Sequence, residues 1–313
     1  MALTKSLTSK RGPRGTVGLD IDSAFLAAAQ TDARAIVRAV STELAPGIVN
    51  EGEVVDADAL GDALKRFFRD NKLPRRVRLG ISNQQIVVRP LEVPKLDDEK
   101  ELDAAIRFQT ADAIAMPLEE AVIDYQVVGE AMSSEGRKTL RVIVVAARAS
   151  MIDRFLDAMR RAGLRPEGID LNAFALVRTS MTRATPEDGA KVLCHLGGTT
   201  NLAVALANTC LFTRPLSTTW DEEGDHVGFA LAEEIRLSID FYATQPETPV
   251  VESIRLSGPG ARREGLAEEL ERLVGLPVAT PDPLGGLDPT ALSQEEDVFR
   301  HSVAAGLALG AAA

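Results

Sequence analysis

The chain has 313 residues, of which 45% are hydrophobic and only 4% aromatic, and this length is enough for about two domains. Its formal net charge at pH 7 is −11. A protein that binds nucleic acid regardless of sequence needs an excess of Lys and Arg to displace counterions from phosphates. The charge therefore argues against that class, and we expect no nucleic-acid partner.

Membrane insertion and secretion are not predicted either. The two longest apolar runs, at 142–147 and 303–313, are shorter than the ~20 residues that cross a bilayer. Residues 1–15 carry four cations with no hydrophobic stretch behind them, which favours a flexible basic tail over a secretory signal or a membrane-surface anchor. Cys194 and Cys210 lie among aliphatic residues, so we expect reduced core cysteines in a cytoplasmic protein.

Hydrophobic alternation and breaker residues predict the same order of strands and helix twice along the chain. The first copy is predicted to contain strands near 16–21, 24–30 and 35–41, a helix near 57–71 with Asp56 as its N-cap, and a strand near 77–82. The second copy is predicted to contain strands near 191–196, 200–206 and 209–215, a helix near 226–243 and a strand near 252–257. This is an α/β protein with two duplicated β-β-β-α-β halves.

The segment 84–165 interrupts the repeat with its own β-α-β-β-α order. We expect strands near 84–92, 121–129 and 138–148, a turn at 133–136, a helix at about 98–114 capped by Asp97, and a final helix from about 150 to Gly163. A small sheet with two helices is a common interaction module. The expected division is a tail at 1–15, a first subdomain at 16–83 and 166–187, an inserted small α+β module at 84–165, a second subdomain at 188–218 and 252–313, and a small helical lid at 219–251.

Two glycine turns follow strands of the second copy. Gly197-Gly198-Thr199-Thr200 is a tight turn whose glycines allow positive φ and whose N–H groups could face a phosphate, although an ordinary hairpin turn also explains it. Gly258 and Gly260 connect a strand to a helix that ends at Gly275, an order typical of nucleotide sites. The three histidines have no metal-binding spacing, and no catalytic residue is predicted.

The two halves, with their small-residue hairpins and the late glycine turn, resemble the actin-like ATPase superfamily. Within the inserted segment, the run Val88 to Pro94, Met116-Pro117 and Asp124-Tyr125 are similar to PilM, the actin-like type IV pilus assembly family related to the division protein FtsA. Later segments agree with that family, namely Arg214-Pro215, Leu231 to Ile235, Asp240 to Tyr242, Leu256 to Gly258, Val278 to Pro283 and Ala305 to Leu309. The resemblance covers about 16–310.

The resemblance implies two phosphate hairpins and an adenosine-side glycine turn that hold ATP or ADP with Mg²⁺. Carried over to this chain, the implied nucleotide-binding residues are Asp20, Ser23, Gly197, Gly198, Thr199, Thr200, Glu234, Gly258 and Gly260. Asp20 is also the implied metal-side carboxylate. Glu234 stands where such folds bring a carboxylate to the ribose, and a solvated surface Glu is the alternative.

Three residues depart from the family pattern. Asp22 replaces a glycine of the first hairpin, Ala27 replaces a lysine, and His195 stands where the second hairpin usually carries an acidic residue. A carboxylate beside a polyphosphate repels it, the missing ammonium removes a favourable charge, and an imidazole is not an oxygen ligand for Mg²⁺. We therefore expect weak or absent ATP hydrolysis.

The resemblance implies a cytoplasmic scaffold of type IV pilus assembly that lies beneath the inner membrane. In the family, the partner PilN docks an N-terminal cytoplasmic peptide into a groove that involves the inserted module. Other pilus assembly components are further expected partners. A working actin-like ATPase and an FtsA-like division or secretion-system adaptor are the alternatives. The C-terminal run 307–313 lacks the basic and aromatic residues of an FtsA-type membrane helix, which disfavours the division protein. Homo-oligomerisation stays open.

Overall fold

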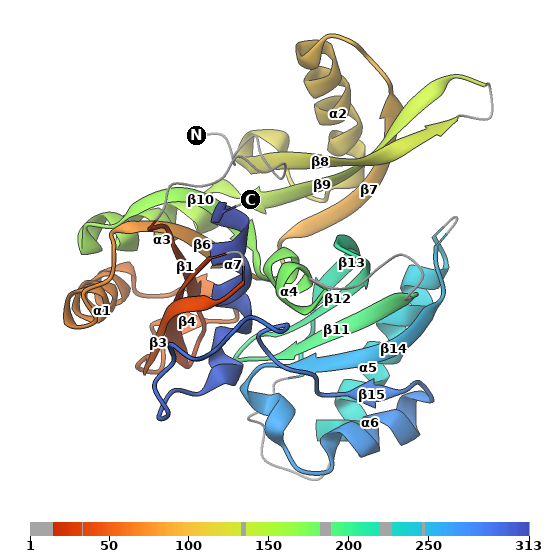
Figure 1. Cartoon of the computed structure of the whole chain (residues 1–313). Helices are drawn as coiled ribbons and strands as arrows, with labels where there is room; N and C mark the ends of the chain where they lie inside the picture. The colour runs from red at the N-terminus through yellow and green to blue at the C-terminus, as the bar shows by residue number, and fades with distance from the viewer. Residues whose placement is uncertain are drawn as a thin grey trace. The chain divides into compact units, whose positions relative to one another are not determined.

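The computed structural model describes residues 15–32, 34–132, 136–181, 189–218, 227–245 and 248–312 (Figure 1). These residues form two compact units, a smaller one that contains Gln85–Arg154 and a larger one on either side of it in sequence. The predicted basic tail before Gly15 and most of the turn predicted at 133–136 lie outside the described residues, as does the start of the predicted lid.

The first half of the larger unit is a five-stranded sheet in the order β10-β6-β1-β2-β3. Its elements are β1 (Val17–Ile21), β2 (Phe25–Thr31), β3 (Ile36–Glu43), the short hairpin β4 (Val49–Asn50) and β5 (Glu53–Val54), α1 (Ala57–Asp70), β6 (Arg76–Ile81) and β10 (Arg165–Leu171). The central strand β1 pairs antiparallel with β2 and parallel with β6. Asp56 caps α1 as predicted, because its side chain accepts a hydrogen bond from the Ala59 N–H at 2.9 Å.

The second half repeats this plan in the order β13-β12-β11-β14-β15. Its elements are β11 (Ala190–Leu196), β12 (Thr200–Leu206), β13 (Thr209–Pro215), α5 (Val227–Ala243), β14 (Val251–Ser257), the 3₁₀ turn η3 (Pro259–Arg262), α6 (Leu266–Val274) and β15 (Val278–Ala279). Here β11 is antiparallel to β12 and parallel to β14. The predicted duplication is confirmed, and each sheet gains a further parallel edge strand, β10 or β15, that the sequence analysis did not predict.

One buried helix joins the halves, and a second packs against it. α4 (Asn172–Ser180) contacts strands of both sheets, and α7 (Ser302–Ala312) packs against α4 and β1 (Figure 1). A Cβ on Gly18 of β1 would overlap the carbonyl oxygen of Ala304, so only glycine lets α7 approach this closely. The apolar run at the end of the sequence is thus a core helix of the first sheet, whereas the sequence analysis groups it with the second copy.

The smaller unit is an antiparallel sheet in the order β7-β9-β8 with one helix on a face. It comprises β7 (Val87–Pro94), α2 (Glu99–Ala113), the 3₁₀ turn η1 (Leu118–Glu120), β8 (Ala121–Met132), β9 (Lys138–Arg148) and the start of α3 (Ala149–Ala162). Val93, Ile106 and Val142 belong to its own core.

One predicted cap in the smaller unit is wrong. Asp98, and not Asp97, begins α2, since the Asp98 carboxylate accepts hydrogen bonds from the N–H groups of Lys100 at 2.7 Å and Glu101 at 3.2 Å. An N-cap side chain must reach the amide of the second or third helical residue, and the residue directly before the helix, Asp98, is placed to do so. Adjacent aspartates cannot be distinguished by composition alone.

Among the described residues, no helix combines the length and the apolar composition that a bilayer crossing requires.

Candidate functional site

The candidate site lies where the hairpin turns β1–β2 and β11–β12 meet within the larger unit. Asp22, at the tip of the first hairpin, accepts a hydrogen bond through Oδ1 from the Ala24 N–H at 2.9 Å. Its Oδ2 accepts another from the Gly198 N–H of the second hairpin at 2.7 Å. One carboxylate therefore closes its own turn and bonds to the other half of the unit.

The glycines of the second hairpin are required by close approach. A Cβ on Gly197 would lie 2.8 Å from Asp22 Oδ2, and a Cβ on Gly198 would overlap Ser23 Oγ and Asp22 Oδ1. Positive φ, the reason that the sequence analysis offered, is wrong, since neither glycine has it. The glycines make room for the opposite hairpin.

Asp20 lies at the end of β1, buried, with its Oδ1 accepting a hydrogen bond from Asn172 Nδ2 at 3.3 Å. Burial raises its pKa well above the usual range, the nearby Asp22 charge adds to this, and the Asn172 hydrogen bond opposes it. Ala27, at the family's lysine position, pairs directly with Asp20 across β1 and β2 and so projects from the same face. A lysine there would have placed a cation beside Asp20.

His195 occupies the position in β11 that Asp20 occupies in β1. The ring is buried, and its Nδ1 lies 3.0 Å from Ser257 Oγ in the neighbouring strand β14. Burial lowers its pKa to about 4, so the imidazole is neutral near pH 7. No negative charge for a metal comes from this position.

A second contact crosses between the halves beside the hairpins. Ser82, after β6, donates a hydrogen bond to Asn201 Oδ1 on β12, and Asn201 Nδ2 donates to the Thr199 carbonyl at 2.9 Å. The cavity lined by Asp20, Ser23, Thr199 and their neighbours has a volume of about 10 Å³, room for one water molecule.

Magnesium-bound nucleotide does not fit this arrangement. The cavity of about 10 Å³ between the hairpins holds one water molecule and has no room for a phosphate group. The Gly198 N–H, an expected phosphate donor, already donates to Asp22. The described residues contain no group of three acidic, His or Cys side chains placed to hold a metal ion. Two buried oxygens nearby, Asn172 Oδ1 and Thr200 Oγ1, have no hydrogen-bond partner.

The residues expected on the adenosine side lie outside this cavity. The Glu234 carboxylate on α5 accepts hydrogen bonds from the N–H groups of Ser217 and Thr218 at 3.0 to 3.1 Å, and so anchors the chain after β13. Gly258 has φ +82°, and a Cβ there would lie within 2.9 Å of the Leu196 backbone. Gly260 is buried in the 3₁₀ turn η3. These three residues serve local structure in this conformation.

The structure thus brings together Asp20, Ser23, Gly197, Gly198 and Thr199, and the next residue, Thr200, is buried. Asn172, Ser82 and Asn201 were missed by the sequence analysis. Asn201 directly follows the second hairpin turn and could have been suspected. Asn172 is 152 positions from its partner Asp20, and no local pattern marks it.

The duplicated sheets with facing hairpins define an actin-like ATPase fold. The solved structure of Spiroplasma citri MreB5 bound to ADP matches over 95% of this chain and 96% of its own, with a TM-score of 0.50 and 12% identity. The cytoplasmic domain of EpsL, an inner-membrane component of the type II secretion system of Vibrio cholerae, matches over 94% of both chains with a TM-score of 0.51 and 12% identity.

A more specific match comes from type IV pili. A chain of a PilM-PilN type IV pilus biogenesis complex is 24% identical, with a TM-score of 0.81 over 96% of this chain and all of that one. The family model of the type IV pilus assembly protein PilM matches residues 18–217. The chain belongs to the PilM family of type IV pilus assembly proteins.

Proposed function

We propose that this protein is a cytoplasmic scaffold of type IV pilus assembly that binds the N-terminal cytoplasmic peptide of a PilN-like inner-membrane protein. Its membership of the PilM family carries the proposal, and the fold shared with a chain of a PilM-PilN complex supports it. The protein would lie at the inner face of the membrane through this partner.

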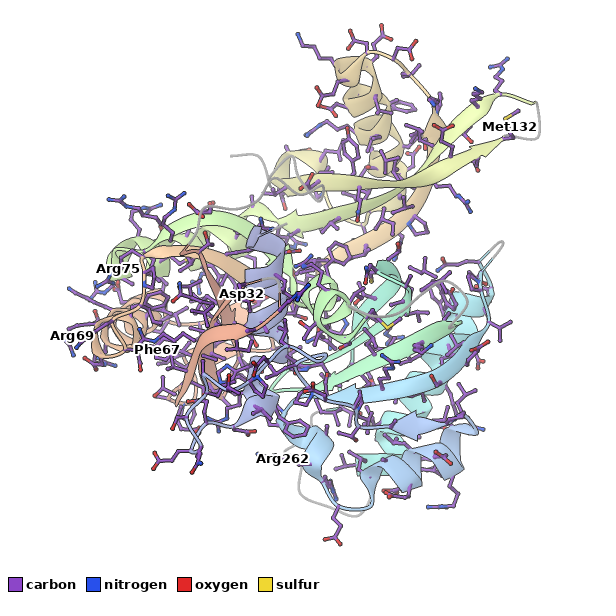
Figure 2. The ribbon with its side chains drawn as sticks, viewed as in Figure 1. Asp32, Phe67, Arg69, Arg75, Met132 and Arg262 are labelled. Atoms are coloured by element: carbon purple, nitrogen blue, oxygen red, sulfur yellow. The ribbon has the colours of Figure 1, made fainter. Side chains whose placement is uncertain are left out.

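The smaller unit is where we expect the peptide to dock. It has its own apolar core and also exposes large apolar side chains. Phe108 on α2 is 75% exposed, and Met132 is 63% exposed. Figure 2 shows Met132 at the far end of β8. Exposed apolar residues supply binding energy when a partner removes them from water.

Calorimetric titration of the full chain with the PilN-like peptide tests the proposal. We expect Phe108→Ala or Met132→Ala to weaken binding by about tenfold, a typical effect for a well-buried contact residue. Leu237→Ala is the matched control, since Leu237 on α5 is 60% exposed but lies outside the smaller unit. No binding by the unmodified chain, or equal losses in all three variants, would contradict the proposal.

The alternative function is a working ATPase, and the likeness to an ADP-bound MreB5 is the observation that favours it. The small cavity, the occupied Gly198 amide and the neutral His195 argue for weak or absent turnover instead. We expect no Mg²⁺-dependent phosphate release above a no-protein control. Steady turnover that persists after repeated purification would favour the enzyme.

A further inference from the structure

A carboxylate stands where a phosphate-binding hairpin would hold its ligand. Backbone N–H groups at a glycine-rich turn attract anions, and the Gly198 N–H points at an anion that belongs to the chain itself. Asp22 Oδ2 accepts this hydrogen bond at 2.7 Å while Oδ1 accepts one from Ala24 at 2.9 Å. The side chain is held at both oxygens, so its placement does not depend on one contact.

The shapes of the two hairpins agree with this contact. Both Gly197 and Gly198 lack the space for a Cβ because Asp22 and Ser23 fill it. The hydrogen bond from Ser82 to Asn201 adds a second link between the halves. The remaining cavity of about 10 Å³ leaves no room for an external phosphate group.

A phosphate group and the Asp22 carboxylate cannot occupy the same place. They would share one N–H donor, and two negative charges a few ångströms apart repel each other strongly where water is excluded. We propose that Asp22 is a built-in anion that replaces a ligand phosphate, holds the two halves of the larger unit closed without nucleotide, and must leave before any phosphate-bearing ligand enters.

The test compares the full chain with Asp22→Gly and Asp22→Asn. The glycine variant removes the side chain, whereas the asparagine variant keeps its size and removes its charge. Asp32→Gly is the matched control, because Asp32 also caps a turn, accepting from the N–H groups of Arg34 and Ala35 at 2.8 Å, and is exposed. The readouts are hydrogen exchange at the Gly198 amide and affinity for MgATP and for inorganic phosphate.

We expect exchange at Gly198 to accelerate at least tenfold in Asp22→Gly and less in Asp22→Asn, and to stay unchanged in Asp32→Gly. MgATP should bind at least tenfold more tightly to Asp22→Gly than to the unmodified chain. Unchanged exchange at Gly198 in Asp22→Gly, or equal MgATP affinity in the two proteins, would overturn the proposal. Phosphate binding without MgATP binding would also overturn it. Removal of the Asp22 side chain would then admit a phosphate ion between the hairpins without admitting a nucleotide.

This inference is independent of partner binding. The PilN-like peptide is titrated into the same variants, so loss of peptide binding in every protein would reject the scaffold and leave the built-in anion standing. Retained peptide binding with unaltered exchange at Gly198 would do the reverse.

Discussion

Asp20 and His195 stand at equivalent positions in the two halves, and burial disfavours the charged form of both. The pKa of Asp20 is raised well above its usual value, while that of His195 is lowered to about 4. The hydrogen bonds to Asn172 and Ser257 are compatible with uncharged partners. Burial therefore disfavours charge at this position of each half.

Replacing Asp20 with Asn should therefore stabilise the protein relative to the unmodified chain, by an amount that grows as the pH rises. An acid whose folded pKa is raised gives its full stability below its unfolded pKa, near 3.8, and loses it as pH rises through the folded value. Asparagine does not titrate, so its advantage in melting temperature should be largest near pH 8 and shrink toward pH 4.

Thermal unfolding across that pH range checks the prediction. Asp32→Asn is a control of opposite sign, because backbone hydrogen bonds from Arg34 and Ala35 lower the pKa of the exposed Asp32. Compared with the unmodified chain, Asp32→Asn should have a lower melting temperature at pH 8, and the difference should shrink toward acid pH. An Asp20→Asn protein whose loss of stability grows as the pH rises would contradict the prediction, because it would show that the ionised carboxylate has a favourable charge partner.

Among the elements, the tips of the two hairpins approach each other so closely that Gly197 and Gly198 have no room for a side chain. A methyl group on Gly198 would overlap Ser23 Oγ and Asp22 Oδ1, so we expect Gly198→Ala to lower the free energy of unfolding by about 1–3 kcal/mol. Denaturant titration measures the change. Adding Asp22→Gly should recover part of the loss, because it removes one of the overlapping groups.

Gly129→Ala is the control for that experiment. Gly129 lies on β8, and a Cβ there would meet only Arg141 side-chain atoms at 3.8 Å, an ordinary contact. Its effect should stay within about 0.5 kcal/mol. Equal losses in the two alanine variants would mean that the hairpins do not approach each other this closely.

Across the whole molecule, two units have separate cores. Ile106 is 1% exposed in the core of the smaller unit, and Leu64 on α1 is fully buried in the larger one. Truncation of either to Ala should cost about 2–5 kcal/mol. We expect Ile106→Ala to accelerate hydrogen exchange in β7, β8 and β9 while β1 and β11 stay protected, and Leu64→Ala to accelerate exchange in β1.

Loss of protection throughout the chain in both variants would instead indicate one cooperative unit. Hydrogen exchange followed by mass spectrometry distinguishes these outcomes, since protection reports the free energy of local opening segment by segment. If Ile106→Ala unfolds only the smaller unit, the same variant can be used in the peptide titration to remove the proposed docking site while the larger unit stays folded.

Local patterns were enough to predict most of the elements. Alternating apolar residues mark the strands that begin each half, and the apolar stripe after Asp56 marks α1, because these signals arise within a few residues. The edge strands β10 and β15 escaped prediction, since β15 has only two residues and β10 completes a sheet begun far earlier in the chain. The choice between Asp97 and Asp98 required the cap geometry itself.

The amino-acid sequence alone was enough to identify the duplicated halves, the glycines at the second hairpin and the three departures at Asp22, Ala27 and His195. The effect of those departures depends on contacts that exist only in the folded chain. Asp22 is 176 positions from Gly198, and Asn172 is 152 from Asp20. Contacts over such separations follow from the packing of two sheets against the shared helix α4, which no local pattern encodes. In the sequence, Asp22 is only the absence of a glycine, whereas in the folded chain its carboxylate accepts a hydrogen bond from the Gly198 N–H and so links the two halves.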